Sequence, residues 1–135
     1  MASTPAYWSN RRMGRAVLSS AAVTDKTGAT TTNIVDILTG VAAGTEITEI
    51  KVQADGDPAD SIILIFLHNG TDYRLFEEFD IGNPAAGSTT VAAYTETRYF
   101  TGLFLPSASW KLAAGITVAT TAGNVVVWAS GGDLT

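Results

Sequence analysis

The chain has no cysteine and only one histidine, His68, among its 135 residues. Without cysteine it can form no disulfide, no thiolate zinc site and no thiol nucleophile. A single histidine also excludes a histidine-rich metal cluster and a paired histidine acid–base site. These absences predict a fold that is stabilised by its hydrophobic core alone.

Charged residues are scarce as well, at 16% of the chain, and long apolar runs are missing although 46% of the residues are hydrophobic. The run Ile62–Leu67 is far shorter than the roughly 18 to 20 apolar residues of a membrane span, so no membrane association is expected. A chain of 135 residues buries enough surface to support one core without staples.

The acidic clusters do not match a known catalytic or metal-binding motif. Asp55, Asp57 and Asp60 superficially resemble a calcium loop, but the later ligands of such a loop are missing. Glu77 and Glu78 are neighbours, and neighbours in a strand point to opposite faces, so they cannot form a glycosidase pair. We therefore expect no enzymatic activity, no cofactor, no metal and no small-molecule ligand.

Short apolar runs separated by turn residues predict an all-β protein. Their regular spacing favours an antiparallel β-sandwich, most simply a jelly roll of about eight strands, with a closed barrel as the alternative. Ile47 interrupts the alternation of its strand and predicts a bulge there. The expected strands are 15–23, 33–38, 45–53, the two strands of a hairpin within 61–81, and then 90–100, 102–105, 109–113, 116–121 and 125–129. Asn33 could instead begin a single helical turn as its N-cap.

The hairpin can be assigned a register. Asn69-Gly70 suits a two-residue type I′ turn, which places Phe66 opposite Tyr73 and Leu64 opposite Leu75 on one face. That face is expected to be the core. Because the first strand of the hairpin is apolar on both faces, a second sheet, an N-terminal arm or a neighbouring molecule should cover its other side.

The aromatic residues of the C-terminal half, Phe100, Phe104, Trp110 and Trp128, lie in strand-like runs. Core packing is the expected role of all four. A pair of exposed tryptophans would instead favour a sugar-binding platform, because such surfaces on β-sandwiches bind carbohydrates.

The first 15 residues hold three arginines and no acid, whereas the remaining 120 carry 5 basic and 13 acidic residues. We predict an extended arm over residues 1–14 and a single β-sandwich domain over residues 15–135. The body lacks a broad basic face, so nucleic acid is not expected, and the arm should dock on an acidic protein surface. The predicted partner-binding residues are Tyr7, Trp8, Arg11, Arg12 and Arg15.

Three segments are informative together: the hairpin segment LHNGTDYRLFEEFDI, the later YFTGLFLPSASWKLAAG and the closing ASGGDLT. Through them, residues 61–134 resemble a group of small proteins of tailed bacteriophages that are encoded among virion structural genes. The residues that carry the resemblance are Phe66, His68, Gly70, Tyr73, Arg74, Leu75, Leu105, Pro106, Trp110, Leu112, Gly131, Gly132 and Asp133. All are scaffold residues, and the resemblance brings no catalytic motif.

The resemblance implies a virion component, made in the host cytoplasm and located on the capsid exterior as a decoration or cement protein. Its partners would be the major capsid protein and copies of itself. A tail or neck position is an alternative, and a carbohydrate-binding module is the alternative from a different functional class.

Overall fold

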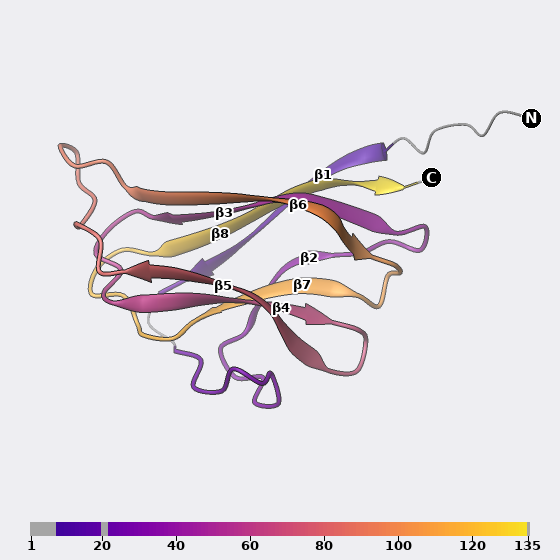
Figure 1. Ribbon diagram of the computed structural model, residues 1–135, viewed down its shortest axis with the longest axis horizontal. Coiled ribbons are helices and arrows are strands. Elements are labelled where there is room, and N and C mark those ends of the chain that lie inside the picture. The colour runs from indigo at the N-terminus through magenta and orange to yellow at the C-terminus, as the bar shows by residue number, and fades with distance from the viewer. Residues whose placement is uncertain (1–7, 20–21, 135) are drawn as a thin grey trace, which may run out of the picture.

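The computed structural model describes residues 8–19 and 22–134 and shows a two-layer β-sandwich (Figure 1). Its strands are β1 (Trp8–Leu18), β2 (Val35–Thr39), β3 (Thr45–Ala54), β4 (Ser61–His68), β5 (Tyr73–Gly82), β6 (Tyr94–Leu105), β7 (Lys111–Ile116) and β8 (Val125–Leu134). They form two four-stranded sheets, β1-β8-β3-β6 and β2-β7-β4-β5. This strand order is that of a jelly roll, so the expected fold class is confirmed.

The strands pair in nested order around the loop between β4 and β5. β4 pairs with β5, β3 with β6, β2 with β7 and β1 with β8, each time antiparallel. The chain is thus one long hairpin that rolls up, so that β3 also meets β8 and β4 also meets β7. Figure 1 shows the first and last strands, β1 and β8, side by side in one layer.

Apolar side chains that alternate along the strands fill the space between the sheets. On β3, Ile50 and Val52 are completely buried. The bulge expected at Ile47 is confirmed, since the pairing of β3 with both neighbours shifts between Ile47 and Glu49. The shift turns Ile47 into the core, where it is also completely buried, and burial of such a side chain contributes about 1.5–3 kcal/mol.

The β4–β5 hairpin exists, but its expected register is wrong. Phe66 pairs with Leu75 instead of Tyr73, a displacement of two residues. A register shift between Ile65 and Phe66 makes the displacement three at Leu64, which pairs with Glu78 instead of Leu75. Near the loop, a displacement of two keeps Phe66 and Tyr73 on the same face. The rings of Phe66 and Tyr73 therefore still meet edge to face, with their centroids 6.4 Å apart.

The loop holds four residues, Asn69–Asp72, because the Asn69 side chain caps it. Its Oδ1 accepts hydrogen bonds of 2.9 Å from the backbone N–H groups of Thr71 and Asp72. Of the expected turn pair, Gly70 alone has a positive φ, whereas a type I′ turn needs two such residues. The local side-chain bonds thus favour the longer loop over the two-residue turn.

The expected core face of this hairpin is also wrong. Ile63 and Ile65 point into the space between the sheets, whereas Leu64 and Phe66 lie on the outer face in a smaller cluster with Val23. The four β4 residues are nevertheless completely buried. The second sheet covers one side of β4 and the chain's own segment around Val23 covers the other, so no neighbouring molecule is needed.

At the N-terminal end, the strand expected from Arg15 begins at Trp8. Residues 8–14 of the predicted arm therefore belong to the sheet, where they pair with β8.

Other strand ends differ too. β2 begins at Val35, because Asn33 has a φ of 68° and its side-chain amide donates to the carbonyl of Ala22. The strands expected at 90–100 and 102–105 form the single strand β6. Residues 117–121 form no strand, and β8 continues beyond its expected end to Leu134.

The loop that leads from Val23 to β2 is held by Asp25. Its carboxylate accepts hydrogen bonds from the hydroxyl and the backbone N–H of Thr27, at 2.7 and 2.9 Å, and from the N–H of Thr30 at 3.0 Å. These bonds favour the ionised form and lower the pKa of Asp25 from 3.8 to about 2. The ionised carboxylate therefore stabilises the loop that follows Val23, the residue that packs on the outer face of β4.

We expect Gly70→Val to lower the free energy of unfolding by about 1–3 kcal/mol, because valine is strained at positive φ. An added Cβ would also lie 3.1 Å from the Cβ of Ser109. Urea denaturation measures the change, and Thr71→Val in the same loop is the matched control. Equal stability of the two variants would contradict the loop geometry.

We expect Asp25→Ala to destabilise the protein above pH 3.8, where the carboxylate is ionised in both the folded and the unfolded chain. Because folding lowers the pKa to about 2, this contribution is lost as the pH falls between these two values. Urea denaturation over this pH range, with Asp60→Ala as the control, measures the difference. A difference that stays constant down to pH 2 would contradict the assignment.

Candidate functional site

The outer face of the β1-β8-β3-β6 sheet is the candidate binding surface. On β8, Val127 and Ala129 point into the core, so Trp128 and Ser130 point outward. Antiparallel pairing aligns the outward residues of β1, β8 and β3 in rows. The rows are Val17, Val126 and Gln53; Arg15, Trp128 and Lys51; and Met13, Ser130 and Glu49.

This face is open to solvent and rich in large apolar side chains. Met13 is 67% exposed and Tyr99 is 79% exposed. Trp8, Val17 and Phe104 are also exposed on this face. Exposed apolar side chains that gather on one face are typical of a binding surface.

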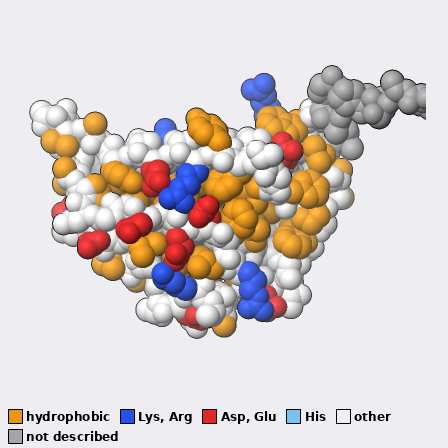
Figure 2. All heavy atoms as spheres, viewed as in Figure 1, with side chains coloured by type: hydrophobic (Ala, Val, Ile, Leu, Met, Phe, Trp, Pro, Cys, Tyr) orange, Lys and Arg blue, Asp and Glu red, His pale blue; other side chains and the backbone are white. Residues whose placement is uncertain are grey.

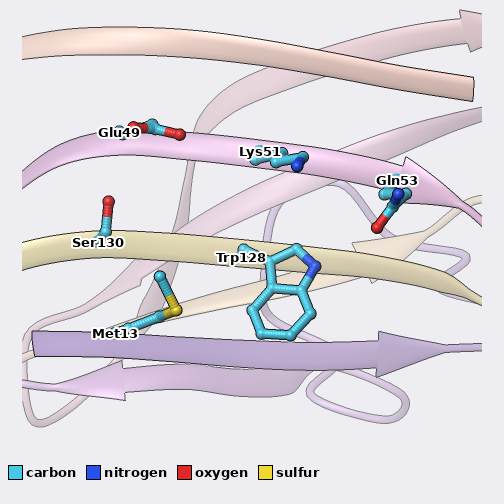
Figure 3. A pocket seen from close by; sticks show the side chains of 6 residues that line it. All are labelled: Met13, Glu49, Lys51, Gln53, Trp128 and Ser130. Carbon is cyan, nitrogen blue, oxygen red and sulfur yellow. The ribbon is translucent and has the colours of Figure 1, made fainter.

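Two adjoining hollows lie on this face and share Met13 and Ser130 as lining residues. The first, of about 320 Å³, is lined by Met13, Glu49, Lys51, Gln53, Trp128 and Ser130 (Figure 3). The second, of about 270 Å³, is lined by Trp8, Arg11, Arg12, Met13, Thr48, Ser130 and Gly131. We call them the Trp128 hollow and the Trp8 hollow.

The structure brings three of the predicted partner-binding residues together and separates a fourth. Trp8, Arg11 and Arg12 line the Trp8 hollow. Arg15 lies beside the other hollow, with its guanidinium carbon 5.5 Å from the centroid of the Trp128 ring. Tyr7 lies outside the described residues. A role of these residues in partner binding stays a prediction.

Arg12 differs from its neighbours because its guanidinium is bound within the chain. It forms an ion pair of 2.9 Å with Asp133 and donates a second hydrogen bond of 2.9 Å to the carbonyl of Thr39. The hydroxyl of Thr45 donates to the same Asp133 oxygen at 2.8 Å. Asp133 is only 7% exposed, so this group, the Asp133 lock, ties β1, β3 and β8 to the end of β2.

The expected core positions of Trp128 and Phe104 are wrong, because Trp128 is half-buried outside the core cluster and Phe104 is exposed. The residues on either side of Trp128 in β8 and of Phe104 in β6 are buried. Because side chains alternate along a strand, these two aromatic side chains point outward. In the sequence, the alternating apolar residues Val125, Val127 and Ala129 already indicate that Trp128 points to the other face of the strand. The core role of Phe100 and Trp110 is confirmed, since both pack, half-buried, against the main core.

Other sequence candidates take part in the fold. The Nδ1 of His68 accepts a hydrogen bond from the N–H of Gly70 at 3.1 Å. Asp55 accepts one of 2.7 Å from the N–H of Asn124. Within residues 8–19 and 22–134, no cluster of three or more potential metal ligands is found. No helix in this part of the chain is long and apolar enough to cross a membrane.

At the edge of the sandwich opposite β1, charged side chains of β5, β6 and the loop that holds Lys26 pair with one another. Arg98 lies 3.3 Å from Glu77 and 3.0 Å from Glu96, and Lys26 lies 2.7 Å from Glu78. Figure 2 shows basic and acidic side chains interleaved over this side, beside an area of hydrophobic ones. The charges of this edge are thus largely balanced within the chain.

No protein-family model and no curated protein sequence matches the chain. Among solved structures, the chain is similar to a chain described as "Cyanophage Pam1 capsid asymmetric unit". The sequences are 12% identical, the TM-score is 0.45, and the alignment covers 98% of this chain and 93% of the other.

We expect Arg12→Ala to lower the free energy of unfolding by about 1–3 kcal/mol, because the buried carboxylate of Asp133 loses its charged partner. Arg11→Ala, one position away but outward, should change stability by less than about 0.5 kcal/mol. Urea denaturation of both variants measures the contrast. Equal effects would mean that the Asp133 lock does not stabilise the fold.

Proposed function

We propose that this protein is a virion structural protein of a tailed bacteriophage, a capsid decoration (cement) protein that binds and stabilises the assembled shell. The observation that carries the proposal is the Trp8 hollow, where the exposed indole of Trp8 lies next to Arg11 at the edge of a sheet. Tryptophan and arginine are the side chains that most often dominate the binding energy of protein interfaces.

The charge around the Trp8 hollow supports a protein partner. Among the described residues, Arg11 lies within ion-pair distance of no carboxylate, in contrast to Arg98 on the opposite edge. A free cation beside exposed apolar surface suits a partner that offers an acidic patch. The acid-rich remainder of this chain makes nucleic acid a poor partner, since it would repel the phosphates.

The position of β1 supports the same function. Among the strands that the structure describes, β1 is the edge strand of its sheet and pairs with β8 alone, so a strand from a neighbouring protein can pair with its other edge. A rigid sandwich with an apolar, cationic edge is suited to lie across the seam between shell subunits.

The fold itself does not choose between functions, because jelly rolls occur both in viral capsids and in lectins. The resemblance of residues 61–134 to phage virion proteins favours the capsid. A cement protein acts by mass action, because it binds the assembled shell and not the free subunits and so shifts the equilibrium toward the assembled state.

The test uses particles that lack the protein, with purified chain added back. Heating should rupture the depleted particles at a lower temperature, and added protein should restore them with saturable stoichiometry. Trp8→Ala and Arg11→Glu should weaken this rescue, and the Arg11 effect should be larger at low salt, where screening is least.

Arg74→Glu is the matched control, because Arg74 is an exposed cation on β5 that makes only a loose contact of 3.8 Å with Asp72. It should rescue as well as the unchanged protein. Particles that are equally robust with and without the protein would refute the cement role, and binding confined to tails or necks would place the protein elsewhere in the virion.

A further inference from the structure

The Trp128 hollow contains an aromatic platform. Figure 3 shows the indole of Trp128 lying across the space between β8 and β1 with its broad face toward the viewer. Met13 lies beside it at the same side of the sheet. An indole on a sheet surface offers an apolar plane on which the C–H face of a ring can stack. The guanidinium of Arg15 lies over the same ring, with its carbon 5.5 Å from the centroid, so a stacked ligand would displace or flank that contact.

The polar side chains around this platform are not used by the fold. Within the described part of the chain, Glu49, Lys51 and Gln53 form no side-chain hydrogen bond and no ion pair. They lie on successive outward positions of β3, next to Trp128 and Ser130 of β8. Carboxylate, ammonium, amide and hydroxyl groups thus surround one aromatic face with both donors and acceptors.

The charged groups beside the platform carry both signs, with Glu49 next to Lys51 and Arg15. They therefore do not form a site of a single sign such as a dedicated anion or cation site has. An apolar protein surface would bury these polar groups without hydrogen-bond partners, which is unfavourable. A neutral ligand with several hydroxyl groups and an apolar C–H face suits both the indole and the hydrogen-bonding groups around it.

We infer that the Trp128 hollow is a subsite for a neutral pyranose unit of a glycan. The sugar ring stacks on Trp128, and Glu49, Gln53 and Ser130 bond its hydroxyl groups. At about 320 Å³, the hollow is at the small end of ligand pockets, which suits one or two sugar rings. The site adjoins the Trp8 hollow and shares Met13 and Ser130 with it, but Trp128 and Gln53 line the Trp128 hollow alone, so a shell contact restricted to Trp8 and Arg11 leaves the indole open.

The experiment follows the indole N–H signals of the purified full chain by ¹⁵N NMR during titration with maltotetraose, cellotetraose and chitotetraose. At least one of these probes should shift the Trp128 signal saturably, with a Kd on the order of 1 mM. Sorbitol, an open-chain polyol, and inorganic phosphate are the control ligands and should produce no saturable shift.

Three variants locate the site. Trp128→Ala should abolish the shifts of the neighbouring amide signals, and Gln53→Ala, a mild surface change, should weaken binding roughly fivefold, as expected for one lost hydrogen bond. Trp8→Ala is the matched control at the other hollow and should leave the Kd unchanged. The amide spectrum of each variant shows whether it is folded.

Absence of a saturable shift with all three oligosaccharides would overturn the inference. So would saturable binding of phosphate or sorbitol at this site, or binding that survives both Trp128→Ala and Gln53→Ala. Because the titration uses no particles, its failure leaves the shell-stabilising function intact, and failure of the particle rescue leaves the sugar subsite intact.

Discussion

Nested antiparallel pairing around the β4–β5 loop is the constraint on which the rest of this structure depends. Each successive pair of strands outward from that loop, β3 with β6, β2 with β7 and β1 with β8, encloses the pair before it in the chain. Because side chains alternate with a period of two, the register also decides which side chains face the core. The candidate surface is therefore a consequence of pairing, since Trp128 faces outward because its neighbours face inward.

Strand β1 lies at the edge of its sheet, whereas its partner β8 is also held by β3, so a side-chain contact gives β1 an additional fixed point. The Asp133 lock supplies one at the end of the sandwich, where a buried carboxylate binds Arg12 and Thr45 at once. Hydrogen bonds to a charged group are stronger than neutral ones. The arginines at the start of the chain thus have different roles, and Arg12 stabilises the strand that presents its neighbour Arg11 to solvent.

One outer face of the sandwich is covered by a segment of the chain, and the other is open to solvent. The segment around Val23 covers the outer face of β4 and β7, and Asp25 holds that segment in place through hydrogen bonds that need an ionised carboxylate. The outer face of β1, β8 and β3 is left open, with exposed apolar side chains and polar groups that the fold does not use. Binding is therefore possible on one face, while the other contributes to stability.

The sequence by itself determined the all-β class, the jelly-roll expectation, the hairpin and the bulge at Ile47, because alternation and turn residues are local signals. It did not determine the hairpin register, since the hydrogen bonds of the Asn69 side chain outweighed the preference of Asn-Gly for a two-residue turn. It also did not separate Arg12 from Arg11, or Trp128 from the core. The difference between the two arginines depends on which strand lies beside which, because Asp133 is far from Arg12 in the chain and only the tertiary structure brings them together. The outward position of Trp128 follows from alternation with Val127 and Ala129, but only the tertiary structure places Trp128 beside Lys51.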